Sequence, residues 1–369
     1  MGFLIYLIFG CLLSWGLTKL VIAWAKSKNL LDLPNERKWH KTPIPLGGGI
    51  AIWLAFSIVI LITLVFYPQH LLGRDLSFLK IGAISLASLV IIVGGYLDDK
   101  YNLSPLKQFI APTIAALIIV LAGIGVSYVS NPFGGLLFLD SLKFGAYNLG
   151  NQTITLGVWG SIFTFLWLMG MMYTTKLLDG LDGLASGIGV IGALIIFGLT
   201  MIEQWFQPSI GLVAIIFSGC ALGFLIHNFH PAKVFLGEGG SLYIGFMLGV
   251  LAIVSGGKIA TALLVMGIPI LDVVWVIIRR LWVDKTGVAT ADRRHLHHRL
   301  LDVGFSHRQA VVFLYFLTGC FGVASLFLHT QGKLMALSIL ILVMLILATS
   351  LVVAYKRKIK KTGVGNPVS

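Results

Sequence analysis

Charge is scarce in this chain, and negative charge is the scarcest. The 369 residues include 14 Asp and Glu against 27 Lys and Arg, and 57% of the residues are hydrophobic. Soluble globular domains carry about 25% charged residues, whereas this chain carries 11%. Together with a mean hydropathy of +0.95, this composition excludes an ordinary soluble domain and predicts a chain that lies mostly in lipid.

Cysteines are few, and internal repeats and long linkers are lacking. The three cysteines, Cys11, Cys220 and Cys320, all fall within apolar runs, so the sequence implies no disulfide framework. The lack of a clear repeat argues against many secondary transporters. We therefore expect a single domain over residues 1–369. Its first apolar run, residues 3–24, lacks the basic n-region of a signal peptide, so we expect a retained span there.

The apolar runs are close to the length that crosses a bilayer as a helix. We predict an all-α integral membrane protein, because lipid offers no solvent to satisfy the open edge of a sheet. The eleven predicted spans are residues 3–24, 47–66, 77–97, 107–129, 154–173, 184–202, 209–227, 240–255, 258–278, 309–329 and 333–355.

Lys and Arg indicate the orientation of these spans. They crowd one set of alternate loops, whereas the opposite set carries Arg74, Lys80, Lys143, Lys258 and Lys333. By the positive-inside rule the crowded side is cytoplasmic, which puts the N-terminus outside and the C-terminus inside. This basic face suits anionic lipid headgroups and nucleotide phosphates. No nucleic-acid partner is expected, because the basic residues are scattered along the chain.

The acids of interest lie in the same crowded loops. Asp98, Asp99, Asp179, Asp182 and Glu238 each follow a long apolar run, with a basic residue or glycines close by. Carboxylates are costly near lipid, so several at one depth point to a metal ion and an anionic substrate. Adjacent side chains on a helix diverge by about 100°, so the first two acids are expected to face different partners. A capping role for Asp182 or Glu238 stays open.

Other polar residues are candidates for contacts with the substrate. Lys41 precedes two prolines and three glycines, and it is either a phosphate contact or a topogenic lysine. Asn228 and Lys233 lie in H-N-F-H-P-A-K, where an amide and a cation could face an anion. Asp272 lies inside a predicted span, which marks it as functional unless a structural partner such as Lys or Tyr explains it.

Three histidines lie close together in D-R-R-H-L-H-H-R-L, residues 292–300. His295, His297 and His298 could ligate zinc, but no Cys or carboxylate completes a convincing closed zinc set. We favour hydrogen bonds to a phosphate or a sugar, supported by the neighbouring Arg293. A solvated basic loop is the alternative for the arginines.

In chain order the five loops read H-K-T-P-I-P-L-G-G, L-D-D-K, L-L-D-G-L-D-G-L-A, N-F-H-P-A-K-V-F-L-G-E-G-G-S-L and H-L-H-H. This ordered set on one face resembles the polyprenyl-phosphate N-acetylhexosamine-1-phosphate transferases of bacteria, over essentially the whole chain. The H-x-H-H form, followed by R-L-L and S-H-R-Q, looks more like the simple N-acetylhexosamine branch than the branch that transfers phospho-muramoyl-pentapeptide.

The resemblance implies transfer of N-acetylhexosamine 1-phosphate, expected to be that of N-acetylglucosamine, from a UDP-sugar to undecaprenyl phosphate. UMP would be released, Mg²⁺ would be needed with Mn²⁺ as a substitute, and the product would start a cell-envelope glycan. The active face would be the cytoplasmic side of the bacterial cytoplasmic membrane, and a homodimer stays open. Taken with the patterns above, catalysis is expected of Asp98, Asp99, Asp179 and Asp182, metal binding of Asp99, Asp182 and Glu238, and substrate binding of Lys41, Lys176, Asn228, Lys233, Asp272, Arg293, His295, His297 and His298.

Two residues depart from the pattern of that family. Lys176 stands where the family usually has Asn, and Glu238 stands where it usually has a metal-binding Asp. We predict that they act as a matched pair, the longer acid reaching around the added cation. Two rival functions stay open. A transporter or scramblase of lipid-linked sugars would need acids at mid-membrane and paired repeats, and an inactive scaffold would tolerate both departures.

Overall fold

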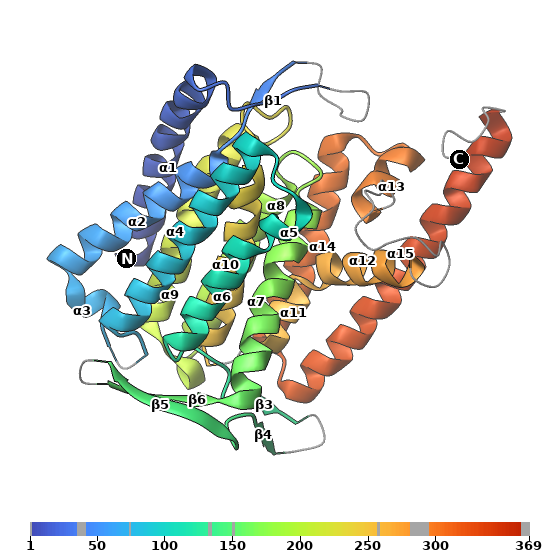
Figure 1. Ribbon diagram of the computed structural model, residues 1–369. Coiled ribbons are helices and arrows are strands. Elements are labelled where there is room, and N and C mark those ends of the chain that lie inside the picture. Colours follow the sequence, from blue (N-terminus) through green and yellow to red (C-terminus); the bar gives the residue numbers. More distant parts are fainter. Residues whose placement is uncertain are drawn as a thin grey trace.

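Helices make up most of the computed structural model (Figure 1). The structure describes residues 2–34, 42–73, 75–131, 135–149, 152–256, 259–280 and 295–362. Two of the predicted substrate contacts, Lys41 and Arg293, lie outside the described residues. The helices are α1 (Gly2–Ser27), α2 (Gly48–Phe66), α3 (Pro68–Leu71), α4 (Phe78–Tyr101), α5 (Pro105–Gln108), α6 (Ile110–Leu121), α7 (Val158–Leu178), α8 (Leu184–Thr200), the short 3-10 helix η1 (Glu203–Trp205), α9 (Pro208–Asn228), α10 (Gly237–Val254), α11 (Ile259–Val265), α12 (Gly267–Arg279), α13 (Leu296–Val303), α14 (His307–Phe327) and α15 (Thr330–Thr362).

The described helices include 8 that are long and apolar enough to cross a membrane, or up to 9 if the bent pair α11–α12 counts as one span. Two shorter apolar helices, residues 105–121 and 184–200, coincide with two further predicted spans. The prediction of eleven spans therefore finds a helix at every position, but not eleven full-length ones. The chain is a mostly helical, multi-pass membrane protein.

The predicted span 258–278 is broken in the structure. Helices α11 and α12 meet at an angle of 76°, and α12 lies crosswise to most of the bundle in Figure 1. Two residues explain the break. Pro269 has no backbone N–H to continue the helix ladder, and a Cβ on Gly267 would lie 2.2 Å from Cδ2 of Leu340 on α15. Helix α12 carries Asp272, which contacts His295.

The all-α prediction misses three small antiparallel hairpins. They pair β1 (Leu31–Asp32) with β2 (Ile44–Pro45), β3 (Tyr128–Ser130) with β4 (Leu136–Phe138), and β5 (Lys143–Leu149) with β6 (Gln152–Gly157). Strands therefore replace the end of the predicted span 107–129 and the start of 154–173. The alternation in β6, where Ile154 and Leu156 are buried and Thr155 is exposed, is typical of a strand with one covered face.

Helix α10 lies at the centre of the bundle, packed against α2, α4, α7 and α8. Glycines allow the closest of these contacts. A Cβ on Gly95 of α4 would lie 2.0 Å from Cα of Gly239, and a Cβ on Gly49 of α2 would lie 2.2 Å from Cα of Gly240. Because no other residue fits such a backbone approach, the start of α10 is fixed beside the end of α4.

The loops that carry the predicted site lie at one end of the bundle (Figure 1). The carboxyl ends of α4, α7 and α9 meet the amino ends of α8, α10 and α14 there, with α13 alongside, while β3–β6 lie at the opposite end. The fold thus gathers the predicted loops on one face. Which side of the membrane this face occupies stays a prediction from the Lys and Arg distribution.

Candidate functional site

The two adjacent acids at the end of α4 have different partners. Asp98 is buried, and its Oδ1 accepts hydrogen bonds from the backbone N–H of Leu103 (3.0 Å) and from Nε2 of Gln108 (3.2 Å). Asp99 instead accepts a hydrogen bond at Oδ1 from the backbone N–H of Glu238, at 3.0 Å. The divergence expected from helix geometry is therefore present: Asp98 holds the turn into α5, and Asp99 faces the start of α10.

Gly237 makes the approach of Asp99 to α10 feasible. Its φ of +73° lies in the left-handed region, and a Cβ there would lie 2.3 Å from Oδ2 of Asp99. Any other residue would combine backbone strain with a collision against the carboxylate. The first glycine of G-E-G-G is thus required by the position of Asp99.

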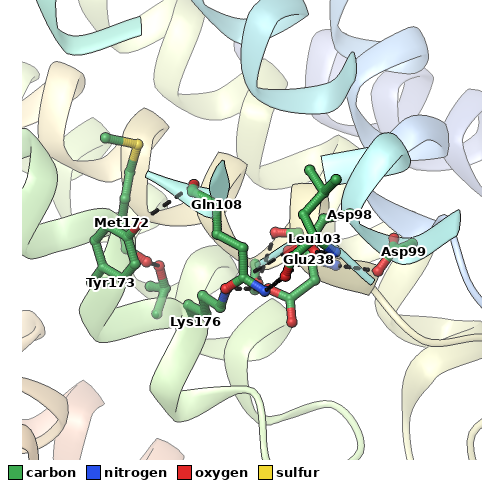
Figure 2. Close-up of polar contacts among 10 residues, drawn as sticks. Asp98, Asp99, Leu103, Gln108, Met172, Tyr173, Lys176 and Glu238 are labelled. Carbon is green, nitrogen blue, oxygen red and sulfur yellow. Dashed lines mark hydrogen bonds and ion pairs between the residues drawn. The ribbon is translucent and has the colours of Figure 1, made fainter. Parts of the chain in front are cut away.

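Lys176, on the last turn of α7, lies among these acids (Figure 2). Its Nζ is 2.7 Å from Oε2 of Glu238 and 4.0 Å from Oδ2 of Asp98, and it donates to Oε1 of Gln108 at 2.9 Å. The contact expected between Lys176 and Glu238 is present. Gln108 was missed by sequence reasoning, although an uncharged polar residue within a predicted apolar span was a signal for a buried hydrogen-bond network.

Asp179 occupies the C-cap of α7, where the helix dipole disfavours a negative charge. Burial, followed by the charges of Glu238, Asp182 and Asp99, raises the pKa of Asp179 to about 8. The other three acids are thus close enough to Asp179 to oppose its ionisation. A compensating cation is what such a group of oxygen ligands favours.

Asp182 lies in the turn between α7 and α8, and it does not cap α8. The N-cap position belongs to Gly183, and no side chain caps the helix there. Oδ2 of Asp182 instead accepts a hydrogen bond from the backbone N–H of Ala232 (3.1 Å) and lies 2.7 Å from Nδ1 of His230. The capping alternative for Asp182 is therefore wrong, and the carboxylate connects two loops.

Asn228 connects the same two loops from within the core. It is buried; its Oδ1 accepts hydrogen bonds from the N–H of Gly183 (3.1 Å) and from Oγ of Ser186 (2.8 Å), and its Nδ2 donates to the carbonyl of Val234 (2.9 Å). These contacts give Asn228 a structural role in shaping the site. Its contact with substrate stays a prediction, as does that of Lys233, which is exposed.

The histidine motif and Asp272 form one unit. Asp272 is buried; its Oδ2 lies 2.9 Å from Nδ1 of His295 and its Oδ1 accepts from the backbone N–H of Leu296 at 2.8 Å. The carboxylate therefore stabilises the start of α13, where the helix dipole favours a negative charge. The partner of Asp272 is a histidine rather than the Lys or Tyr considered from sequence.

His297 brings this unit against D-G-L-D-G. A Cβ on Gly180 would lie 2.3 Å from Nε2 of His297, so the ring packs directly over that glycine. Nε2 is buried and has no hydrogen-bond partner among the described residues. Burial lowers the pKa of His297 well below its usual value, and the neighbouring His298, His295 and His307 add to the shift. A neutral imidazole, with a ring nitrogen that none of the described residues binds, thus packs over Gly180, which stands between Asp179 and Asp182 in the sequence.

Two further histidines at this end were missed as site residues. His230 precedes a cis proline in N-F-H-P-A, and His307 begins α14 in S-H-R-Q. Their rings stack at a centroid distance of 4.1 Å, beside Asp182. Asn228 and Lys233 are the site residues predicted from sequence in the first segment, and the second serves there as a family marker, although a histidine in each was a signal for a charged or metal-binding neighbour.

Comparison with known proteins shows a consistent set of relatives. Residues 81–256 match the model for "Glycosyl transferase family 4". The chain is 33% identical to the probable undecaprenyl-phosphate N-acetylglucosaminyl 1-phosphate transferase of Bacillus subtilis, over 86% of this chain and 83% of that protein. It is 31% identical to the decaprenyl-phosphate N-acetylglucosaminephosphotransferase of Mycobacterium leprae, over 85% and 81%. It is 29% identical to the undecaprenyl-phosphate alpha-N-acetylglucosaminyl 1-phosphate transferase of Escherichia coli K12, over 79% and 74%.

Proposed function

Because the chain belongs to glycosyl transferase family 4, we propose that it transfers N-acetylglucosamine 1-phosphate from UDP-N-acetylglucosamine to a polyprenyl phosphate and releases UMP. The names of its relatives pair N-acetylglucosamine phosphate transfer with undecaprenyl or decaprenyl phosphate. The observation that carries the proposal for this chain is the convergence of Asp99, Asp179, Asp182 and Glu238 at one end of the bundle. Three segments far apart in the sequence supply these acids, and the partly buried cation Lys176 lies beside them.

The donor set at this end fits Mg²⁺. All four side chains offer carboxylate oxygens, which is the ligand type that Mg²⁺ prefers. Burial and the neighbouring acids raise the pKa of Asp179 to about 8, and a bound cation would offset both effects. We propose that Asp99, Asp182 and Glu238 would hold the ion. When bound, Mg²⁺ would supply positive charge that offsets the repulsion between the diphosphate and the lipid phosphate.

The reaction needs an oxygen of the lipid phosphate to attack the β-phosphorus of the UDP-sugar while the bond to the UMP oxygen breaks. In-line displacement of this kind depends on positioning and on charge, more than on covalent chemistry by the protein. Lys176 is placed to contact a substrate phosphate once Glu238 turns to other partners. Nε2 of His297 has no hydrogen-bond partner in the part of the chain that the structure describes, and we propose that it donates to or accepts from the sugar or a phosphate.

Release of UMP provides the test. Purified chain in lipid nanodiscs would be incubated with undecaprenyl phosphate, Mg²⁺ and each of a panel of UDP-sugars, with coupled detection of UMP and extraction of the lipid product. We expect UMP and a polyprenyl-diphospho-sugar to form together with UDP-N-acetylglucosamine. Correctly folded chain that makes neither product with any UDP-N-acetylhexosamine would support the inactive scaffold instead.

A further inference from the structure

A second group of metal-ligand side chains lies next to the acidic cluster. Among the described residues, Asp182, His230 and His307 each offer one ligand atom, and these atoms all lie within 4.8 Å of one another. They come from the α7–α8 turn, from the loop after α9 and from the first residue of α14. We call them the Asp–His–His site. The proposed transfer reaction uses neither histidine.

The protein holds these groups in place through its backbone. Oδ2 of Asp182 accepts from the N–H of Ala232 at 3.1 Å, and Nε of Arg308 donates to the carbonyl of His230 at 2.9 Å. The His230 and His307 rings stack nearly parallel, with 14° between their planes. The two imidazoles and the carboxylate are thus fixed relative to one another by several elements, as a ligand site requires.

One nitrogen in the group lacks a partner. Nε2 of His307 is buried and makes no hydrogen bond within the part of the chain that the structure describes. Buried polar atoms are nearly always paired, so an unpaired one calls for a ligand or an ion that the side chains do not supply. A histidine that faces another histidine and a carboxylate is well placed to use that nitrogen for a metal.

We propose that the Asp–His–His site binds a transition-metal ion of the Zn²⁺ type. Two imidazoles with one carboxylate and an open position form a donor set used for zinc and its neighbours, whereas Mg²⁺ prefers oxygen ligands throughout. At Zn–N and Zn–O distances of about 2.0–2.2 Å, tetrahedral ligand atoms lie about 3.3 Å apart. The 2.7 Å distance between Nδ1 of His230 and Oδ2 of Asp182 would lengthen when the ion binds, and the proton between these two atoms would be released to solvent.

The contacts of Asp182 with His230 and Ala232 both use its Oδ2, and a carboxylate has a second oxygen to offer. In the proposed function that residue also serves Mg²⁺, so the two ions would share one carboxylate; this consequence rests on the proposed function. Binding of the transition-metal ion does not rest on the proposed function, because this binding depends on the two histidines. A measurement of metal binding therefore tests the inference even in a chain that proves inactive.

Cobalt is a suitable probe, since its visible absorption reports coordination by fewer than six ligands. Metal-stripped full-length chain would be titrated with Co²⁺ in detergent with excess Mg²⁺ present to fill oxygen sites. We expect saturable d–d absorption at one ion per chain, which Zn²⁺ displaces. His307→Gln or His230→Gln should weaken Co²⁺ binding by at least about tenfold, since even loss of an outer-shell partner costs that much. The double variant should abolish the signal.

Matched variants locate the ion. His329→Gln changes an exposed histidine between α14 and α15 and should leave Co²⁺ binding unchanged. His297→Gln should also retain the signal, and its loss there with retention in the His230/His307 double variant would move the ion to the H-L-H-H segment and overturn the inference. A wild-type chain that shows only the spectrum of hydrated Co²⁺ would equally overturn it.

A second measurement needs no variant and so does not depend on whether the variants fold. X-ray absorption at the zinc edge of the wild-type chain, loaded with one equivalent of Zn²⁺, counts imidazole ligands through their multiple scattering. We expect two imidazoles with oxygen ligands completing the shell. Oxygen ligands alone, or three imidazoles, would contradict the Asp–His–His site.

Discussion

The contact between Lys176 and Glu238 allows the sharpest test of the site. Replacing Glu238 by Asp withdraws the carboxylate by one methylene, about 1.5 Å, which turns the 2.7 Å ion pair into a gap of about 4 Å. Replacing Lys176 by Asn removes the cation. Only the double variant has the residues that the family usually carries at both positions. Each single change should therefore impair turnover, and the double change should restore much of it.

The size of the coupling follows from the exposure of the pair. The Lys176 side chain is 18% exposed and that of Glu238 is 36% exposed, so solvent screens the pair in part. Fully exposed pairs contribute about 0.2–1 kcal/mol, and groups in direct contact couple by about 0.5–3 kcal/mol. We take about 1–2 kcal/mol, which corresponds to a factor of about 5–30 in rate.

The assay is a double-mutant cycle on UMP release, run at several Mg²⁺ concentrations. Lys107→Asn is the matched control, because Lys107 is an exposed lysine at the same end of the bundle, and it should turn over like the parent chain. If the rate loss of the double variant equals the product of the two single losses, the pair is not coupled. Lys176 would then be an independent phosphate contact.

Four further predictions follow from the site and the fold. Asp99→Asn should lower UMP release by at least about 100-fold, the scale seen when transition-state charge stabilisation is lost, while size-exclusion elution stays unchanged; a near-normal rate would remove Asp99 from the site. Gly237→Ala should lower the free energy of unfolding, measured by thermal unfolding, by at least about 1–3 kcal/mol. Gly135→Ala should cost less, because both glycines have positive φ but Gly135 has nothing within 4 Å of an added Cβ. Equal losses would argue against the collision with Asp99. Because the pKa of Asp179 is raised to about 8, this acid is protonated below that pH in the metal-free chain and ionised above it. The affinity for Mg²⁺ should therefore rise with pH and level off above about pH 8. Calorimetric titrations in which Asp179→Asn shows the same increase of Mg²⁺ affinity with pH as the parent chain would refute this. A tag between β5 and β6 should be accessible from outside the cell and a tag after the last residue only from the cytoplasm, and labelling of both from one side would contradict the predicted orientation.

Much of the helical framework was determined by the sequence alone. The apolar runs locate a helix at each of the eleven predicted positions, because hydrocarbon excludes unpaired backbone and burial in lipid favours a helix. Family membership, too, was visible in the order of the five loops. Hydropathy did not determine where helices bend or end. The break before Gly267 depends on Pro269 and on contact with Leu340, and the hairpin strands depend on pairing between segments rather than on composition.

The site shows the same division. Sequence spacing identified the acids, because charged residues next to long apolar runs stand out, and it indicated that Asp98 and Asp99 would diverge. It could not show that Asp98 holds Gln108 while Asp99 meets Glu238, that Asp272 caps α13 through His295 and Leu296, or that Asp182 lies against His230.

These pairings join residues separated by up to 139 positions, and no local pattern encodes such a contact. The contact between Asp99 and Glu238 arises because α10 packs against α2 and α4 through glycines that permit backbone approach, which brings the start of α10 to the end of α4. The chemistry of each side chain is thus readable from its identity and its neighbours in sequence. Which side chains oppose or compensate one another was decided only when the helices packed, because electrostatic and hydrogen-bond energies depend on distances of a few ångströms.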